Sequence, residues 1–398
     1  NTGKPIEGTS FDDRLGGKYQ PIKEGDTWGQ RWDLAWFHIT GTVPEAYAGK
    51  QIQLWINITT EGCVYHPDGK VEQHIGFSSI WDARAKRPYV PLTKTAVAGD
   101  PIDFWLEGSV AGYFGVTPLD DVKCKDIDRS DPTRFGERDG KVEKIRLVVF
   151  NDAAWQLTID MKLLLSLYEG LHEDSVRRAK IFKALQDCCD ILGSNPNNFQ
   201  EARDSLKPIM SLTTSASEMD VFAVGHAHID TGWLWPVREG RRKCVRTFAN
   251  QIKLINDYPG YIFGASQPQH YQFVKDDQPE LYERIKQAVK DGKWELQGGM
   301  WVESDCNIPS GESLVRQFIH GKNFFMDEFG KDVTNLWIPD VFGYSAALPQ
   351  IMHLAGVDTF LTQKISWSQF NTFPYNTFFW QGIDGTEILT HFPPEDTY

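Results

Sequence analysis

Residues 220–236 read DVFAVGHAHIDTGWLWP, and at this stretch the chain changes to a pattern of alternating strands and helices. The run DVFAVGHAH predicts a strand, and Pro236 suits the first turn of the helix predicted by PVREGRRKCVRTFANQIKLINDY. Further strands are predicted by YIFGAS, WELQGG, TNLWIP and VDTFLTQ, with helical patterns between them, one of them over residues 279–290. This alternation predicts an α/β catalytic domain over residues 216–398, built on a parallel sheet or a β/α barrel flanked by helices.

Two other patterns precede this domain. From residue 34 to residue 149, runs such as KQIQLWINITT and KIRLVVFND are rich in β-branched and aromatic residues, and turn sequences such as HPDGK separate them. They predict a β-sandwich-like N-terminal domain over residues 1–155. Helical periodicity from residue 161 to residue 206 predicts a helical connector over residues 156–215. We therefore expect a multidomain protein.

The composition narrows the classes of partner. The 398 residues carry a formal net charge of −13, and 41% of them are hydrophobic, as is typical of a folded protein. The negative charge argues against nucleic acid or an anionic membrane as a partner, since both would be repelled. No apolar run approaches the roughly 20 residues of a membrane span. The 14 tryptophans fit either a large β-rich core or stacking against sugars, and composition does not choose between them.

The cysteines indicate the redox compartment. The six cysteines show neither a CxxC pair nor the spacing of a disulfide framework, so a reducing compartment is the simplest expectation. One glycosylation sequon, Asn57-Ile58-Thr59, lies within a strand-like run and is weak support for secretion. We therefore expect a cytoplasmic protein.

A first polar cluster lies within the stretch quoted above. Because side chains alternate along an extended segment, His226, His228 and Asp230 should project to one side of it, with Trp233 close by. Two imidazoles and a carboxylate together could bind a divalent metal of the zinc type. A purely structural role for the His-x-His pair is an equally good interpretation of these residues alone.

Two further clusters follow later strands. In LWIPDVFGYSAALPQ, Asp340 comes directly after a predicted strand and could act as ligand, base or nucleophile, although an N-cap for the next helix is the better interpretation without other information. In GGMWVESDCNIPSGES, Glu303 and Asp305 lie on a loop near a helix start. They could bind sugar hydroxyls or orient the metal ligands. The alternative is that this loop serves only in capping, since Ser310 and Ser313 lie near the helix start.

Several motifs in this order carry a resemblance to a known family. His-x-Asp-x-Gly-Trp occurs as residues 228–233, and Trp-x-Pro-Asp-x-Phe-Gly occurs as residues 337–343. Together with GGMWVESDCNIPSGES, FLTQKISWSQFNTFPYNTFFWQGIDG and LTHFPPEDTY, they resemble glycoside hydrolase family 38, the class II α-mannosidases, and in particular its cytosolic/vacuolar branch. The resemblance is dense over residues 221–398 and looser in the β-rich N-terminal part. It adds a vacuolar or lysosome-like compartment as an alternative location.

The resemblance implies a zinc-dependent retaining α-mannosidase. Such an enzyme would remove terminal α-linked mannose from oligosaccharides or free N-glycans. Carried over position by position, it implies that Zn²⁺ is bound by His228, Asp230 and Asp340. Asp340 would also be the catalytic nucleophile and form a covalent mannosyl intermediate. The residues implied to contact substrate are Trp233, Lys364 and Tyr398; Lys364 stands where the Golgi and lysosomal branches carry arginine.

The resemblance also implies groups that match no residue of this chain. A fourth zinc ligand, a histidine in a later motif, and the general acid are both expected elsewhere, because His353 and His391 lack the right context. We therefore expect a remaining C-terminal polypeptide of the same protein as a partner, beside a mannose-containing oligosaccharide substrate. Assembly into a homo-oligomer is a further option. Two alternatives stay open. One is another metal-dependent carbohydrate hydrolase, such as a deacetylase with Asp340 as general base, and the other is a non-catalytic carbohydrate-binding fragment.

Overall fold

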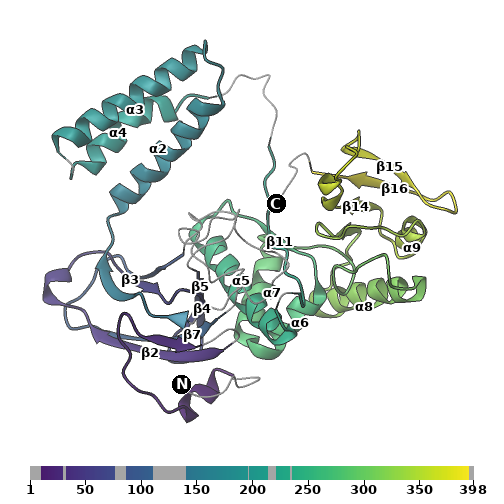
Figure 1. Cartoon of the computed structure of the whole chain (residues 1–398), viewed down its shortest axis with the longest axis horizontal. Helices are drawn as coiled ribbons and strands as arrows, with labels where there is room; N and C mark the ends of the chain where they lie inside the picture. Colours follow the sequence, from purple (N-terminus) through teal and green to yellow (C-terminus); the bar gives the residue numbers. More distant parts are fainter. Residues whose placement is uncertain are drawn as a thin grey trace.

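The computed structural model describes residues 10–29, 33–76, 87–110, 140–195, 197–213, 221–233 and 235–393, and Figure 1 shows their arrangement. A β-rich part, a helical part that stands apart from the rest, and a mixed part of helices and short strands follow one another along the chain. This order is the one expected from the sequence. No helix among the described residues is long and apolar enough to cross a membrane.

The β-rich part is a sandwich, as predicted. One antiparallel sheet has the order β2 (Leu34–Thr42), β7 (Pro101–Ser109), β4 (Glu61–Tyr65) and β5 (Val71–Ile75). The other has the order β6 (Tyr89–Thr93), β3 (Ile52–Asn57) and β9 (Lys144–Val149), and a short pair joins β1 (Thr27–Gly29) to β8 (Gly140–Lys141). Alternate side chains of both sheets, such as Phe37, Leu54 and Leu106, form the core between them. The sequon residue Asn57 is buried and donates a hydrogen bond to Glu143.

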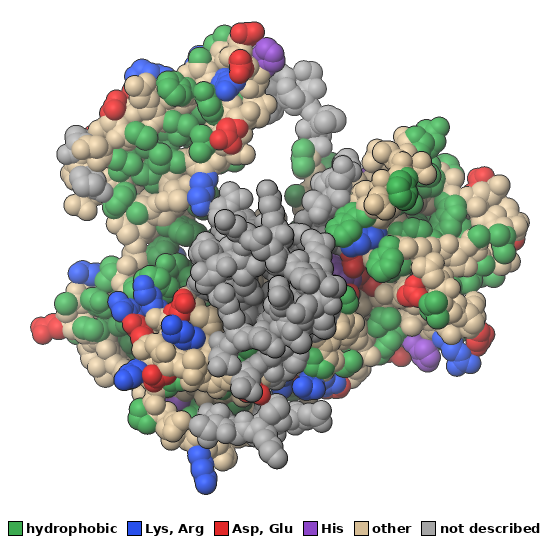
Figure 2. Space-filling view, in the orientation of Figure 1, with side chains coloured by type: hydrophobic (Ala, Val, Ile, Leu, Met, Phe, Trp, Pro, Cys, Tyr) green, Lys and Arg blue, Asp and Glu red, His purple; other side chains and the backbone are tan. Residues whose placement is uncertain are grey.

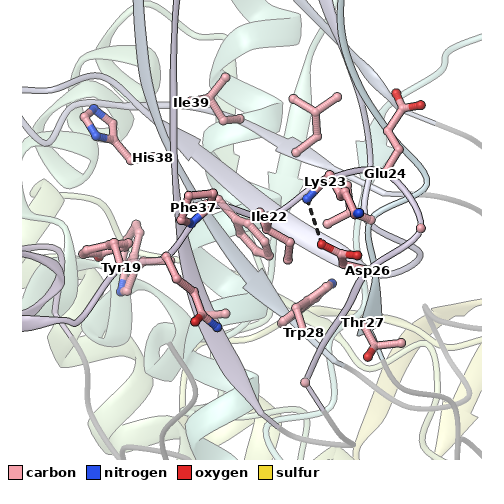
Figure 3. A pocket seen from close by; sticks show the side chains of 18 of the residues that line it. Tyr19, Ile22, Lys23, Glu24, Asp26, Thr27, Trp28, Phe37, His38 and Ile39 are labelled. Carbon is pink, nitrogen blue, oxygen red and sulfur yellow. Dashed lines mark hydrogen bonds between the residues drawn. The ribbon is translucent and has the colours of Figure 1, made fainter.

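A large pocket lies beside strand β2 of the sandwich. Its volume is about 1130 Å³, and its walls are the segment 19–29 and strand β2, with Tyr19, Trp28, Phe37 and His38 among the lining side chains (Figure 3). Tyr19 and His38 both contact the ring of Trp105, at centroid distances of 5.6 and 4.1 Å. None of the metal-ligand candidates lines this pocket.

The connector is helical, as predicted, with three helices among its described residues. They are α2 (Asp152–Gly170), α3 (Val176–Ser194) and α4 (Phe199–Met210). Asn151 and Ser175 cap the first two by accepting hydrogen bonds from backbone N–H groups. A small core that includes Leu157, Leu164 and Leu206 joins the three helices. Figure 2 shows hydrophobic side chains along the visible face of this connector.

The α/β part contains two short sheets. The first is parallel, with the order β10 (Gly225–His226), β11 (Phe263–Ala265) and β12 (Trp294–Leu296). The second has the order β13 (Asn335–Trp337), β14 (Thr359–Leu361), β16 (Glu387–His391) and β15 (Thr377–Gln381), and only β15 runs antiparallel to its neighbour. A closed β/α barrel is therefore not confirmed, because the described strands form two separate sheets. Strand β10 is shorter than predicted, since only its two residues pair with β11.

Five α-helices accompany these sheets among the described residues of the α/β part: α5 (Val237–Asp257), α6 (Pro268–Asp277), α7 (Pro279–Lys290), α8 (Gly311–Phe329) and α9 (Leu348–Leu354). Helix α7 has the predicted bounds, whereas α6 was not predicted. Pro268 is the first residue of α6, and Gln278 is both the C-cap of α6 and the N-cap of α7. The two helices are therefore separated by a single residue.

One hydrophobic cluster joins the sandwich to the α/β part. Trp36, Cys63 and Tyr65 on the outer face of the four-stranded sheet belong to the same buried cluster as Phe248 of α5 and Trp294 of β12. In Figure 1, α5 lies between the sandwich strands β4 and β5 and the other α/β elements. The two parts therefore share a core, and the loop that precedes α5 is held against both.

Candidate functional site

Three of the residues predicted from the first and second clusters come together at the ends of two strands. His228 and Asp230 follow β10, and Asp340 follows β13 in the other sheet. One ligand atom from each of these three residues lies within 4.8 Å of the others. The Nε2 atom of His228 is 3.4 Å from Oδ1 of Asp230 and 3.6 Å from Oδ2 of Asp340. One imidazole nitrogen and two carboxylates thus face a common point.

Glu303 holds the imidazole of His228 from the opposite side. Its carboxylate lies 2.5 Å from Nδ1 of His228 and accepts a second hydrogen bond from Ser266 Oγ at 2.7 Å. Only 3% of the Glu303 side chain is exposed. Because a buried carboxylate accepts the hydrogen on Nδ1, Nε2 is the nitrogen that faces Asp230 and Asp340, and it can bind a metal ion once its own proton has left. Of the alternatives for Glu303, the structure favours orientation of a ligand, whereas Asp305 caps the following turn by accepting from Asn307 and Ile308.

A glycine allows the Glu303 loop to approach the first sheet. Gly298 has φ +95°, and a Cβ atom there would overlap the carbonyl oxygen of Ser266. The loop is then tied down, since the backbone N–H of Glu303 donates to Oε1 of Gln267 at 3.1 Å and Gln267 Nε2 donates to the carbonyl of Ile229. Ser266 and Gln267 were not predicted from the sequence. They follow β11 as His228 follows β10, so the rule that sites gather at strand ends could have found them.

The charge of the cluster favours a cation. Burial alone would lower the pKa of His228, but the carboxylates of Glu303 and Asp230 outweigh it and raise this pKa to about 10. The same contacts lower the pKa of Glu303 although its burial acts in the opposite direction. A cluster that binds a proton this firmly favours positive charge at the point where Nε2 and the two aspartates meet. With its N and O donor set, this point fits a divalent ion of the zinc type.

His226 is not part of this cluster, contrary to the first expectation. Its Nε2 atom is 3.2 Å from Ser266 Oγ, and its ring is 5.1 Å from that of Trp337. Because Ser266 donates its own hydrogen to Glu303, His226 supplies an N–H to the serine oxygen. Burial lowers the pKa of His226 to about 4, so the ring is neutral at ordinary pH. Strand β10 ends at His226, and strict alternation of side chains does not extend past the strand.

Asp340 is not a helix cap. The next helix starts at Leu348, with Ala347 at its N-cap position. Instead, Lys364 Nζ donates to Oδ1 of Asp340 at 2.6 Å, while Oδ2 faces His228. Lys364 Nζ also lies 3.6 Å from the ring centroid of Trp367. Lys364 therefore contacts Asp340 directly.

The remaining predicted residues lie at the edge of the cluster or outside the described residues. Trp233 is 54% exposed, and its ring stands edge-on to Trp235 at 5.4 Å. Trp235 in turn donates from Nε1 to the carbonyl of Asp230 at 3.0 Å. Tyr398 lies outside the described residues. Ser310 caps helix α8, as the capping alternative for that loop had it.

Comparison with known proteins finds family matches for the β-rich part and for the α/β part of the chain. A sequence model of the glycosyl hydrolases family 38 N-terminal domain matches residues 218–398, and one of an α-mannosidase jelly roll domain matches residues 2–132. The chain is 38% identical to α-mannosidase G of Dictyostelium discoideum over 99% of its own length and to human α-mannosidase 2C1 over 96%. It is 33% identical to α-mannosidase of Saccharomyces cerevisiae over 93% of its length. In each case the chain spans about a third of the relative, namely 35, 35 and 34%.

Proposed function

This chain belongs to glycoside hydrolase family 38, and we propose that the protein is a zinc-dependent retaining α-mannosidase that removes terminal α-linked mannose from oligosaccharides or free N-glycans. The observation that carries the proposal is the meeting of His228, Asp230 and Asp340 within 4.8 Å at the ends of two strands. The relatives named as α-mannosidases support the activity.

The donor set supports the choice of metal. His228 would bind through Nε2, since Nδ1 is engaged by Glu303, and each aspartate would contribute one oxygen. When bound, Zn²⁺ supplies positive charge that neutralises the carboxylates and can hold the hydroxyls of a sugar ring. A fourth ligand from outside this chain would complete the tetrahedral set that zinc prefers.

The residues of this chain would then act on the sugar as follows. An oxygen of Asp340 attacks C1 of the mannose, the bond to the leaving oxygen breaks, and a mannosyl ester of Asp340 forms. A general acid from outside the chain protonates the leaving oxygen, and water later cleaves the ester. Lys364 holds the Asp340 carboxylate in one orientation by donating to Oδ1. The exposed indole of Trp233 can cover the apolar face of the ring, and Tyr398 is retained as a substrate contact by family resemblance.

The location and partners of the protein are part of the proposal. We place it in the cytoplasm, with a vacuolar or lysosome-like compartment as the alternative. The cysteines that the structure describes support a reducing environment, because all of them are unpaired: Cys63, Cys188, Cys189, Cys244 and Cys306. The partners proposed are the oligosaccharide substrate and a C-terminal polypeptide of the same protein, with assembly into a homo-oligomer as a further possibility.

Covalent trapping tests the mechanism. The full-length protein is incubated with a fluorinated mannosyl fluoride, which forms the ester but releases it slowly, and peptides are analysed by mass spectrometry. The label should appear on the peptide containing Asp340 and be lost in Asp340→Asn. A deacetylase using Asp340 as general base would acquire no label, and that result would exclude the retaining mechanism.

Glu303→Ala should weaken zinc binding by roughly 10- to 100-fold, because His228 loses its orienting partner.

A second candidate function rests on the pocket of the sandwich. Its lining combines Tyr19, Trp28 and Phe37 with polar groups, a mixture suited to a carbohydrate (Figure 3). If the sandwich binds carbohydrate independently of catalysis, mannose-oligosaccharide binding should survive zinc removal and be lost in Trp28→Ala. Binding that disappears together with zinc would instead assign all sugar recognition to the metal site.

A further inference from the structure

The sandwich and helix α5 meet through a buried network of ion pairs. Glu61 and Glu107 come from the sandwich strands, and Glu239, Arg242, Lys243 and Arg246 come from α5. Glu61 binds Lys243 at 2.9 Å and Arg246 at 2.8 Å, while Arg242 binds Glu107 at 3.2 Å and Glu239 at 3.5 Å. Arg246 also pairs with Glu239, and both side chains are only 2% exposed. With three acids and three bases, the network is electrically balanced.

Part of this network leads to a metal ligand. Lys243, which is bound to Glu61 of the sandwich, places its Nζ atom 4.7 Å from the ring centroid of Trp235. This is within the range of a cation–π contact. The same indole donates from Nε1 to the carbonyl of Asp230 at 3.0 Å. The hydrogen bond restrains the peptide plane that follows Asp230, and with it the backbone from which the Asp230 side chain projects.

A pocket lies beside the ring of Trp235, so fewer packing contacts hold the ring on that side. This half-open pocket of about 200 Å³ is lined by residues of both domains, among them Glu61, Lys243, Trp235 and His228. The indole therefore borders a pocket on this side, where close packing would otherwise hold it. Lys243 is the charged group in this wall that contacts the ring. Helix α5 also lies directly against the metal-binding loop, since a Cβ atom on Gly240 would overlap the carbonyl oxygen of Thr231.

We propose that the sandwich domain positions the metal ligand Asp230, through Glu61 and Lys243 acting on Trp235. Glu61, Lys243 and Trp235 act here as positioning residues, because none of them belongs to the group that could hold the metal and their effect passes through the backbone of Asp230. The inference rests on the proposed function in that Asp230 is taken as a zinc ligand. It assigns the sandwich a part in metal binding besides its part in folding.

The same interface contains a matched control. Lys253, further along α5, binds Glu72 of the sandwich at 3.1 Å. This bridge also joins the two domains, and it makes no contact with Trp235 or the ligand loop among the interactions of the described residues. Its loss measures what a bridge contributes to holding the domains together. A difference between Lys243 and Lys253 variants then measures positioning.

The experiment compares Lys243→Met, Lys243→Arg and Lys253→Met in the full-length protein. Zinc affinity is measured by competition with a chromophoric chelator, and the geometry of the site by the visible absorption of the Co²⁺-substituted protein. Lys243→Met should weaken zinc binding roughly 10-fold and alter the Co²⁺ spectrum, as losses of outer-shell partners do. Lys243→Arg should restore most of both, and Lys253→Met should leave both unchanged while lowering the melting temperature.

A variant inside the loop keeps the test decisive if Lys243→Met does not fold. Trp235→Phe removes the Nε1 donor and keeps an aromatic ring, so it should weaken zinc binding to a similar extent. The double variant Lys243→Met/Trp235→Phe should then be no weaker than Trp235→Phe alone. Equal zinc affinity in wild type, Lys243→Met and Trp235→Phe would overturn the inference and leave the proposed function standing. A wild-type protein that binds no zinc would overturn both.

Discussion

Two regions of the molecule use the same kinds of ion pair in opposite surroundings. One is the interface between the sandwich and helix α5, called the seam below, and the other is the three-helix connector. In the seam, Arg246 and Glu239 are each 2% exposed, whereas in the connector Lys183 and Asp187 are 68 and 47% exposed. Charges that leave water must find complete partners, while exposed pairs compete with water and gain little. Buried pairs therefore allow one docking geometry, and exposed pairs tolerate many.

This difference matches what each region does for the site. The seam borders the loop that bears His228 and Asp230, and a ligand loop must be held to within fractions of an ångström. The connector has its own small core and stands apart from the strands that carry the ligands (Figure 1). It also leaves Trp155, Ile159, Leu163 and Leu167, spaced four residues apart on α2, between 42 and 57% exposed.

The strongest test removes a charge from the seam. Arg246→Met should lower the free energy of unfolding by about 3–5 kcal/mol, because it leaves Glu61 and Glu239 buried without a full set of partners. Denaturant titration of the full-length protein measures the change. Arg203→Met in the connector, whose pair with Asp160 is partly exposed, is the control and should cost much less. Equal costs would remove the distinction between the two regions.

A second test concerns the connector core. Leu206→Ala should cost about 2–5 kcal/mol in the local stability of α2, α3 and α4, because Leu206 is fully buried in a small core. Hydrogen exchange should show faster exchange in these helices. Zinc affinity should stay at the wild-type value. A loss of zinc binding would show that the connector does support the site.

The seam should also respond to acid. Burial lowers the pKa of His74 to about 3; Glu61 opposes this shift, and Arg246, Arg87 and Lys243 add to it. Because the folded pKa lies below the ordinary value of 6.5, the unfolded chain takes up the proton first, and stability falls as pH drops from 6.5 toward 3. The loss should reach about 2 kcal/mol between pH 6.5 and pH 5. Protonation of Glu61, whose pKa its bases lower to about 2 against the effect of burial, adds a further loss below pH 4.5.

Variants of two histidines separate this effect from general acid unfolding. His74→Gln should flatten the pH dependence between 6.5 and 3, as followed by denaturant titrations at several pH values. His172→Gln, in the connector, should leave the curve unchanged, since that ring is 83% exposed. A curve that His74→Gln does not alter would argue against a buried neutral histidine in the seam.

The smallest expected effect is in the connector surface. Lys183→Met should change the free energy of unfolding by no more than about 0.5 kcal/mol, because its partner Asp187 is exposed and one helical turn away. Thermal unfolding in low and high salt measures it. A cost of 2 kcal/mol or more would mean that exposed pairs here act like those of the seam.

Local patterns accounted for much of the fold. The sandwich, the presence of a helical region and the bounds of α7 followed from alternation, turn residues and helical periodicity, all of which act over a few residues. Helix α6 was missed because a short helix separated from α7 by one residue has little periodicity of its own. A barrel was expected from strand–helix alternation, but alternation does not determine which strands become neighbours.

The sequence by itself determined which residue types stand at the strand ends, including His228, Asp230 and Asp340. Only the tertiary structure decided their roles, because these depend on atoms that are distant along the chain. Glu303 lies 75 residues from His228 and fixes which nitrogen faces the aspartates, and Lys364 rather than a helix end meets Asp340. His226, two residues from His228, is excluded because β10 ends there and its ring contacts Ser266 instead of the aspartates. Spacing along a strand limits the candidates, and the packing of separate strands selects among them.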